Sequence, residues 1–540
     1  MSSTLKTIGR IVEEATPDSF IFVAAKEEYP SKYEYVTVKS REIVGGMVRE
    51  VDVLAQVTGL VSRSAVFRSE LDLRTLERAY NAGVDDSNVL CIARTLGFLV
   101  EEAGRIQVFY PRRAIFPGNP VYLAPDDVVR GFFSYSSEEG LHMGHLLTRP
   151  SVEVNASLNG FRRHVAVIAQ TGAGKSYTVG VMLEELLRLG GTVVVIDPHA
   201  DYVFLSRTGD MRRHENSNRI QVFRNPFSSG RYSSKELDNI HDLVFKFSEL
   251  DGDAVSQLAG IPEGWSHVRR AIRIAIRELK NTSPNYMLPD LIAKLEEHAQ
   301  RVESEDQKAA SRAIPHLERL RKFVKVFGDR STSIKDEVLK PGNISVLDLS
   351  GLRDAAQDYI VNRVLEEIFS LRQRGEFEWP IFIVVEEAHR FIPNTDEKRS
   401  GGKMSSHTIR TVVSEGRKFG VFLILVTQRP SKIDSDALSQ CNSQIILRMT
   451  NPKDQNAVAE ASERLGKELM EDLPGLNVGE AIMVGELTRI PVIVKVRKRL
   501  TREGGADIDL VETLRQFHKG KNAELGKEVK PPRTGSYSEV

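Results

Sequence analysis

The sequence predicts an α/β sheet domain that is interrupted by a group of helices and preceded by a small β-barrel. Short runs rich in Val, Ile, Phe and Tyr, separated by turn residues, fill positions 1 to about 130, as expected of a barrel. Apolar strands alternate with amphipathic helices from about 160 onward, which is typical of a parallel sheet. Helical periodicity and abundant charge dominate from about 231 to 340. With 540 residues, the chain is too long for one ordinary domain.

The composition is that of a globular chain without a dominant charge. Lys and Arg number 74 and Asp and Glu also number 74, so only a local patch can indicate nucleic-acid binding. The two cysteines, Cys91 and Cys441, lack metal-site spacing and are expected to be reduced in packed strands. No apolar run reaches about 18 residues and the N-terminus lacks an apolar signal core, so we expect no membrane span and a cytoplasmic enzyme.

The first 130 residues contain six runs that are expected to be strands: Thr7–Val12, Ser19–Ala24, Tyr33–Val38, Val51–Val57, Val89–Val100 and Ile106–Tyr110. The segment 69–82 between them has apolar residues at helical spacing. No catalytic cluster is visible here, so we expect this region to serve assembly or partner contact. Residues 127–160 are expected to be a connector, in which His142 and His145 lack the further ligands of a metal site.

A phosphate-binding loop is predicted between an apolar strand at 165–168 and a helix from 179 to 189. Backbone N–H groups of such a loop converge on phosphate at the positive end of the helix dipole. Lys175 would reach the terminal phosphates and Ser176 would offer its hydroxyl to Mg²⁺. Ala169 stands where the usual pattern has Gly, so this position must not need a positive φ. The predicted nucleotide-binding residues are Thr171, Gly172, Ala173, Gly174, Lys175, Ser176, Tyr177 and Thr178.

Three later apolar strands each run into polar side chains. Asp197 follows the strand 192–196 and therefore lies at the carboxyl edge of the predicted sheet, where ligands bind. It can order the Mg²⁺ shell or a water, or serve as a turn aspartate. Glu386 and Glu387 follow the strand 381–385, which places Glu386 near the metal and Glu387 where it can polarise water. Gln428 follows the strand 421–427 and can sense the γ-phosphate or orient water.

Five basic side chains near these strands are further candidates. Arg410 and Arg417 precede the strand 421–427 on an expected helix, 407–418, and either can stabilise charge in hydrolysis, including from a neighbouring subunit. A structural salt bridge is the alternative for each. Lys398, Arg399 and Lys403 lie in the loop 393–406, and a basic loop can grip a phosphate backbone. An ordinary solvated loop would have the same composition.

The rest of the chain completes the predicted organisation. Helices are expected at 243–250, 268–279, 288–299, 309–326, 359–374 and 454–470, and strands at 344–349, 443–449, 479–485 and 490–496. The expected domains are a barrel at 1–130, a first part of the sheet domain at 131–230, a helical insertion at 231–340, a second part of the sheet domain at 341–510 and a polar tail at 511–540.

Six motifs occur in the order AQTGAGKS, VVVIDPHADY, IFIVVEEAH, SEGRKFGV, LVTQRPS and GLNVGEAIMVG. Together they resemble the HerA family of hexameric DNA translocases, in the FtsK–HerA branch of RecA-like ATPases. The N-terminal β region resembles the HAS-barrel of that family. The resemblance covers about 1 to 510 and implies a RecA-like P-loop NTPase core with a HAS-barrel-like domain and a helical insertion.

The resemblance also implies an activity. A member of this family is a homo-hexamer that uses ATP and Mg²⁺ to pump duplex DNA through its pore. Archaeal members partner the NurA nuclease in resection of DNA ends, and so in double-strand break repair, while bacterial relatives pair with other effector nucleases in phage defence. The alternative function is a nucleotide-switched scaffold ring that activates a nuclease with little DNA pumping. A motor for protein or conjugative DNA export is a third possibility, against which the missing membrane span speaks.

The resemblance implies a role for residues that match the motifs. Lys175 and Ser176 match the phosphate-loop positions, and Glu386 and Glu387 match the acidic pair, with Glu387 as the base. Gln428 matches the sensor position. The acidic pair of the family is usually Asp-Glu, so the longer Glu386 is a departure that bears on metal geometry.

Further positions match less specific parts of the family pattern. Arg417 lies in the EGRKFG motif that supplies a candidate arginine finger, and Arg410 is a second option. Arg163 and the segment 479–481 are candidates to approach the nucleotide. The EEAH motif is similar to the DEAH motif of DEAH-box helicases, but those need two RecA-like lobes. One lobe and one barrel exhaust this chain, which favours a ring in which a neighbour supplies the second face.

Overall fold

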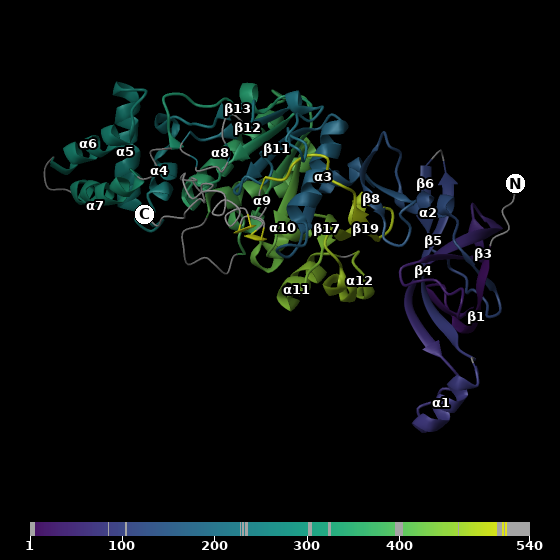
Figure 1. Ribbon diagram of the computed structural model, residues 1–540. Coiled ribbons are helices and arrows are strands. Elements are labelled where there is room, and N and C mark those ends of the chain that lie inside the picture. The colour runs from purple at the N-terminus through teal and green to yellow at the C-terminus, as the bar shows by residue number, and fades with distance from the viewer. Residues whose placement is uncertain are drawn as a thin grey trace, which may run out of the picture. The chain divides into compact units, whose positions relative to one another are not determined.

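The computed structural model describes residues 6–84, 86–102, 105–226, 228, 232, 236–300, 305–321, 326–394, 403–462, 464–504, 510–511 and 514–515. The chain forms two compact units (Figure 1). Unit 1 comprises Met1–Glu185, Gln428–Ser431 and Leu438–Lys498, and unit 2 comprises Leu186–Thr427, Lys432–Ala437 and Arg499–Val540. No helix among the described residues has both the length and the apolar composition needed to cross a bilayer.

A closed barrel of six strands occupies the N-terminal part of unit 1, which confirms the predicted barrel. Its strands are β1 (Thr7–Ala15), β2 (Ser19–Ala25), β3 (Tyr35–Val44), β4 (Met47–Arg63), β5 (Asn88–Glu102) and β7 (Pro120–Leu123). They follow the order β2-β1-β7-β3-β4-β5, and β2 pairs with β5, so the barrel has no open edge. Strand β6 (Arg105–Phe109) pairs with the end of β5. Side chains such as Phe22, Val36, Val53 and Cys91 fill the interior.

The sequence predicted helix α1 of the barrel region but not strand β7. Helix α1 (Leu73–Asn81) lies within the predicted segment 69–82, at the far end of the β4–β5 extension (Figure 1). Strand β7 was missed, because it has four residues and begins with Pro120, a residue that sheets tolerate at strand starts. Such a short run carries too little alternation to be recognised.

Unit 1 also contains six strands of a mixed sheet. Their order is β10 (Val165–Ile168), β17 (Ser443–Leu447), β18 (Glu480–Val484), β19 (Val492–Val496), β8 (Gly140–Leu146) and β9 (Glu153–Ser157). The β10–β17 pair is parallel and the others are antiparallel.

The expectation of a connector at 127–160 is wrong, since this segment contains all but the first residue of α2 (Asp126–Phe133) and both strands β8 and β9. The pairing of β8 with β9 shifts register between His142 and Gly144, and a Cβ at Gly144 would lie 2.0 Å from the carbonyl oxygen of Lys495, so this position requires glycine.

Unit 2 contains a parallel sheet that matches the predicted α/β architecture. Its order is β13 (Ile240–Asp242), β12 (Ile220–Arg224), β14 (Ile344–Asp348), β11 (Thr192–Asp197), β15 (Ile381–Val385) and β16 (Val421–Thr427). Every residue of β11, β14 and β15 is buried, as expected of strands covered on both faces. Helix α8 (Asp354–Gln373) packs against α9 (Met404–Phe419), and α9 packs against β16.

The helical insertion consists of α4 (Gly252–Leu258), α5 (Ser266–Thr282), α6 (Leu288–Gln300) and α7 (Glu305–Leu320), which pack on one another (Figure 1). The helix expected at 243–250 is wrong. There the backbone N–H of Val244 donates to Thr332 Oγ1 at 3.1 Å, and that of Lys246 donates to Ser331 Oγ at 2.9 Å. These long-range bonds use donors that a helix would have used locally.

The helix expected at 454–470 is two helices instead, α11 (Pro452–Ala461) and α12 (Lys467–Asp472). Ser462, at the end of α11, has an extended backbone, so the chain leaves the helix there before α12 begins. A further short helix, α10 (Ser435–Ser439), follows β16.

Neither cysteine is expected to react with a thiol reagent in the folded protein. Burial raises the pKa of both Cys91 and Cys441 to about 12, so almost no thiolate, the reactive form, exists near neutral pH. Cys91 lies in β5 as predicted, whereas Cys441 lies just before β17. Titration with a chromogenic disulfide should detect no thiol in buffer and both thiols in guanidinium chloride. A rapid reaction in buffer would contradict this expectation.

Candidate nucleotide site

The phosphate loop connects β10 to the N-terminus of helix α3 (Lys175–Arg188) in unit 1. Gly172 and Gly174 have φ angles of 76° and 95°, in the left-handed region that favours glycine. Ala169 is fully buried and its φ is not positive, so alanine fits where the usual pattern has glycine. The loop therefore keeps its glycines where the backbone requires them.

Lys175 and Ser176 form the first turn of α3, where backbone N–H groups and the helix dipole favour an anion. The hydroxyl of Thr178 donates to the carbonyl oxygen of Gly174 at 2.9 Å, which ties the loop to the helix. All eight predicted nucleotide-binding residues thus lie on the loop or on the first turn of α3.

The loop is braced by the chain that follows β17. Gln170 Oε1 accepts hydrogen bonds from the backbone N–H of Thr450 at 3.0 Å and from its hydroxyl at 2.9 Å. The backbone N–H of Gln170 donates to the carbonyl oxygen of Arg448 at 3.1 Å. These bonds fix the loop before any ligand binds, which lowers the entropy lost on binding.

Two of the predicted residues also contact the loop within unit 1. The hydroxyl of Thr171 donates to Gln428 Oε1, which brings the predicted sensor to the phosphate loop. The backbone N–H of Gly479 donates to the carbonyl oxygen of Ala173 at 3.3 Å, so the segment 479–481 also approaches it. Arg163 instead forms an ion pair with Glu486 at 3.3 Å.

The acidic residues lie at the carboxyl edge of the parallel sheet in unit 2. Strand β11 ends at Asp197 and β14 at Asp348, and these two residues pair in the ladder. Glu386 directly follows β15, and its backbone N–H donates to the carbonyl oxygen of Ile196 at 3.1 Å. The Glu386 side chain is fully buried. Burial of a carboxylate is costly unless hydrogen bonds compensate, so this edge is a built polar site.

Glu387 adopts a backbone conformation that glycine would prefer. Its φ and ψ are 52° and 44°, in the left-handed helical region, and the side chain is 6% exposed. A left-handed non-glycine residue costs on the order of 1–3 kcal/mol, and such residues cluster at functional sites. His389 Nδ1 lies 3.4 Å from Glu387 Oε2 and 3.2 Å from Thr427 Oγ1. The strained backbone and these neighbours aim the Glu387 carboxylate.

Asp197 makes the contacts of a turn aspartate. Its carboxylate accepts backbone N–H bonds from His199 at 3.2 Å, Asp201 at 3.0 Å and Tyr202 at 2.9 Å. Burial, with the charges of Asp201 and Asp348, raises the pKa of Asp197 well above its ordinary value, and the N–H bonds oppose this shift. These contacts correspond to the turn alternative, and a direct role of Asp197 in hydrolysis stays a prediction.

Two side chains at this edge were missed by sequence reasoning. The hydroxyl of Tyr202 donates to Glu386 Oε1 at 3.0 Å, and burial together with the charge of Glu386 raises the pKa of Tyr202 well above its ordinary value. His389 contacts Glu387, as described above. In the sequence, only their positions could have indicated these two residues, because each closely follows a strand that ends in acidic residues.

The two candidate arginines on α9 have different surroundings. Arg410 Nη2 and Nε lie 2.8 and 3.1 Å from Asp434 Oδ2, so the structural salt bridge that was the alternative is present. The side chain of Arg417 is exposed in the last turn of α9. Among the described residues, no acidic side chain forms an ion pair with Arg417.

The structure describes only part of the predicted DNA-binding loop. Lys398 and Arg399 lie outside the described residues. Lys403 is the residue before the first turn of α9 and is half-buried. The backbone N–H groups of Met404 and Ser405 donate to Asp358 at 2.9 and 3.2 Å, which anchors the N-terminus of α9.

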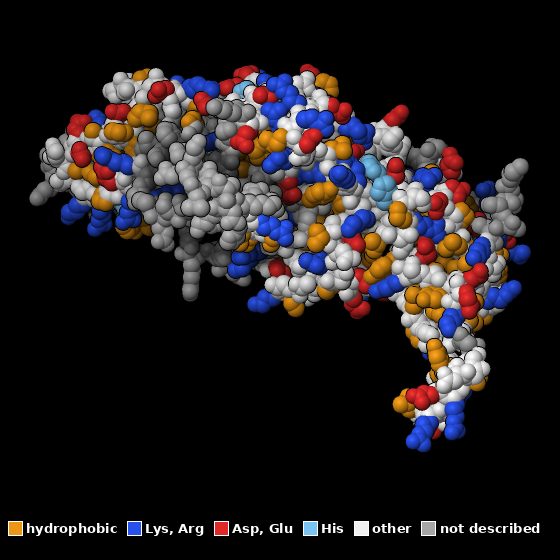
Figure 2. All heavy atoms as spheres, viewed as in Figure 1, with side chains coloured by type: hydrophobic (Ala, Val, Ile, Leu, Met, Phe, Trp, Pro, Cys, Tyr) orange, Lys and Arg blue, Asp and Glu red, His pale blue; other side chains and the backbone are white. Residues whose placement is uncertain are grey.

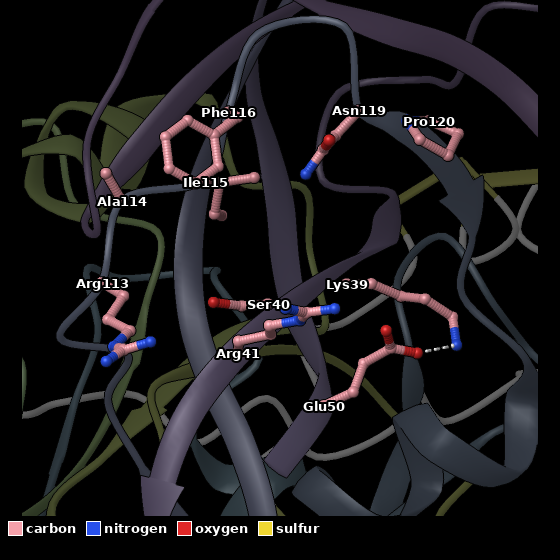
Figure 3. Close-up of a pocket in the computed structure, with 10 residues that line it drawn as sticks. All are labelled: Lys39, Ser40, Arg41, Glu50, Arg113, Ala114, Ile115, Phe116, Asn119 and Pro120. Carbon is pink, nitrogen blue, oxygen red and sulfur yellow. Dashed lines mark hydrogen bonds and ion pairs between the residues drawn. The ribbon is translucent and has the colours of Figure 1, made fainter. Parts of the chain in front are cut away.

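A separate hollow of about 790 Å³ lies on the barrel (Figure 3). Lys39, Arg41 and Arg113 line it together with the apolar Phe116, whose side chain is 70% exposed. Lys39 forms an ion pair with Glu50 at 2.7 Å. A cationic hollow with an exposed aromatic ring has the character of a surface for a partner.

The residues present fit a nucleotide-bound magnesium ion. Mg²⁺ prefers hydroxyl and carboxylate oxygens and takes most of its ligands from phosphates and water. Ser176 in unit 1 carries such a hydroxyl and Glu386 in unit 2 carries such a carboxylate, and their use as ligands of one Mg²⁺ stays a prediction. The described residues include no group of three or more His, Cys, Asp or Glu that could hold a metal by itself.

A glycine-dependent phosphate loop at a helix N-terminus, in a chain whose parallel strands end in buried acids, defines a P-loop ATPase. The profile described as "Helicase HerA, central domain" matches residues 141–368. A relative from Pyrococcus furiosus, "DNA double-strand break repair helicase HerA", is 31% identical over 94% of this chain and 96% of its own length. The chain therefore belongs to the HerA helicase family and is an ATPase.

Other relatives agree with this assignment. "Probable helicase MJ1565" from Methanocaldococcus jannaschii is 30% identical over 94% of this chain and 93% of its own length. The HerA helicase from Saccharolobus solfataricus is 28% identical over 77% of this chain and 80% of its own length. Separately from these relatives, the chain is similar to the solved structure of VirB4 of Thermoanaerobacter pseudethanolicus, with 14% identity and a TM-score of 0.48 over 66% of this chain and 96% of that one, and the family assignment does not rest on this similarity.

The strained backbone of Glu387 is expected to affect the free energy of unfolding of variants at this position. Glu387→Gly should be more stable than Glu387→Ala by about 0.5–1 kcal/mol, because only glycine adopts the left-handed backbone without a Cβ clash. Urea denaturation of both variants measures the difference. Glu415, inside the right-handed helix α9, is the matched control, and there the Gly variant should be the less stable one by about 1 kcal/mol. The same order at both positions would contradict the assignment of strain.

Proposed function

We propose that this chain is an ATP-driven translocase of duplex DNA that acts in the repair of double-strand breaks. The observation that carries the proposal is Glu387, a buried carboxylate held in a strained backbone at a strand end of a P-loop ATPase. The names of the Pyrococcus and Saccharolobus relatives, "DNA double-strand break repair helicase HerA", support the cellular role.

In this proposal the loop residues hold ATP and the acids activate water. Lys175 neutralises the terminal phosphates, and Ser176 and Glu386 ligate Mg²⁺. Mg²⁺, when bound, neutralises the charge that develops between the β- and γ-phosphates. Glu387 accepts a proton from the attacking water, with His389 and Thr427 holding that end of the strand in place. Gln428, already bonded to Thr171, reports the state of the phosphate loop.

We further propose a homo-hexameric ring in which a neighbour completes the site. Arg417 is the better candidate for the arginine supplied in trans, because it is exposed and has no ion pair among the described residues. Arg410 is held by Asp434, so it is better explained as part of the fold. A ring also suits a chain with a single nucleotide-binding core, since each neighbour supplies the second face.

ATP hydrolysis with and without duplex DNA tests the main proposal. Wild-type protein should hydrolyse ATP faster with DNA. Glu387→Gln should reduce kcat by about 10²–10⁴-fold while ATP binding is retained, because a neutral amide cannot take the proton. Native mass measurement of the same sample should give a closed oligomer. Hydrolysis by Glu387→Gln at the wild-type rate would refute the base assignment.

DNA affinity in this proposal comes from local groups. Lys and Arg side chains are interspersed with Asp and Glu over the visible face, in line with 74 residues of each sign (Figure 2). Neutralising Lys398, Arg399 and Lys403 together should therefore weaken duplex binding and flatten its salt dependence, by about 0.9 in log–log slope for each phosphate that the protein no longer neutralises. Fluorescence anisotropy with labelled duplex at several salt concentrations measures both quantities.

A matched triple variant controls for net charge. Arg270, Arg277 and Arg319 are exposed on the helical insertion, so their neutralisation removes the same charge from a solvated face. This control should leave the salt slope unchanged. If both triple variants bind equally well, the DNA path lies elsewhere on the chain.

The barrel hollow favours a second candidate function, a ring whose main act is to hold and activate a nuclease of the NurA type. The exposed Phe116 and the cations around it are an observation that a pure DNA pump does not explain. Triplex displacement separates the two functions. A scaffold would activate the nuclease and displace no third strand, whereas a translocase would displace it.

A further inference from the structure

The buried hydrogen bond between Tyr202 and Glu386 plays no part in the roles proposed above. The hydroxyl of Tyr202 donates to Glu386 Oε1 at 3.0 Å, and both side chains are fully buried. A hydrogen bond to a charged carboxylate is stronger than one between neutral groups, and it fixes the carboxylate in one orientation. Tyr202 lies 184 positions away in the sequence, so only the folded sheet brings the two together.

The backbone holds Tyr202 firmly in this position. Its N–H donates to Asp197 Oδ2 at 2.9 Å, and Ala200, in the same turn, has a φ of 62°. The chain at Gly504 closes over this turn, since its N–H donates to the carbonyl oxygen of Asp201 at 3.0 Å. A Cβ at Gly504 would lie 2.2 Å from the carbonyl oxygen of Ala200, so the approach requires glycine. The tyrosine hydroxyl is therefore a preorganised donor.

A glutamate at position 386 needs a donor that orients its carboxylate more than an aspartate would. Compared with aspartate, a glutamate has one more methylene and one more rotatable bond. A longer carboxylate reaches further but must lose more rotamer freedom to ligate a metal in one geometry. Partners that orient a metal ligand typically change metal affinity by about 10–100-fold when removed.

We propose that Tyr202 is a positioning residue whose hydroxyl holds Glu386 in the orientation that ligates the nucleotide-bound Mg²⁺, and so compensates for the extra methylene of Glu386. The proposal rests on the proposed function, because it assumes that Glu386 is a metal ligand. In this proposal Tyr202 acts only through Glu386.

The same unit provides a matched control. The hydroxyl of Tyr232 donates to Asp348 Oδ2 at 2.6 Å, so a second buried tyrosine is bonded to a carboxylate at a strand end. Asp348 has no role in the proposed metal site. Tyr232→Phe and Tyr202→Phe therefore remove the same hydroxyl and the same kind of hydrogen bond, with similar effects on folding.

Metal binding, measured apart from turnover, tests the proposal. Binding of Mn²⁺ to the full-length protein with ADP is followed by the electron paramagnetic resonance signal of free Mn²⁺. Tyr202→Phe should weaken Mn²⁺ binding by about tenfold and raise the Mg²⁺ concentration for half-maximal ATPase by a similar factor. The KM for ATP at saturating Mg²⁺ should not change. Tyr232→Phe should bind Mn²⁺ like wild type, and equal effects of the two variants would overturn the proposal.

A double-mutant cycle with Glu386→Asp tests the compensation itself. The shorter side chain cannot reach the tyrosine hydroxyl, so Tyr202→Phe should change Mn²⁺ affinity by less than about twofold in the Glu386→Asp background. An undiminished tenfold effect there would show that Tyr202 does not act through Glu386. Failure of wild-type protein to hydrolyse ATP or bind Mn²⁺ with ADP would instead overturn the proposed function.

Discussion

The rest of this structure depends on one constraint, which is that a strand covered on both faces cannot carry a charge inside the sheet. Strands β11, β14 and β15 are buried at every position, and none of them carries a charged side chain before its last residue. Charged side chains are therefore confined to the residues where these strands end. Because parallel strands end at the same edge, residues distant in sequence, such as Asp197 and Glu386, gather there.

Gathering carboxylates in a buried edge has a cost that the surrounding chain must offset. Asp197 is satisfied by three backbone N–H groups of its own turn, and Glu386 accepts from Tyr202. Glu387 is held differently, through a left-handed backbone that stores strain. Each acid is therefore held in place by a different set of contacts.

The phosphate loop also lies where a buried strand, β10, ends. Unlike the acidic edge, it favours a bound anion. Its glycines permit the backbone to curl, while Gln170, Thr450 and Gly479 tie it to the neighbouring strand ends. The barrel strands are antiparallel, so their carboxyl ends do not gather at one end, and closure through the β2–β5 pair leaves no unpaired edge strand. The distinctive surface of the barrel is instead the hollow beside Phe116.

Much of this protein could be predicted from local patterns. The phosphate loop, the strands that precede Asp197, Glu386 and Gln428, and the barrel all follow from periodicity and turn residues, because each is specified within about ten neighbouring positions. The spacing of Gly174, Lys175 and Ser176 alone identified a phosphate site, and the order of the motifs identified the family.

Only the tertiary structure decided which distant groups meet. The bonds from Tyr202 to Glu386 and from Arg410 to Asp434 join separate elements, and neither has a local signature. The segment 243–250 has an apolar pattern that suits an α-helix, but the backbone donors of Val244 and Lys246 bond to Thr332 and Ser331, and only a 3-10 turn at Phe247–Glu249 remains. A buried donor must find a partner wherever the fold supplies one, and that demand is not visible in the neighbouring sequence.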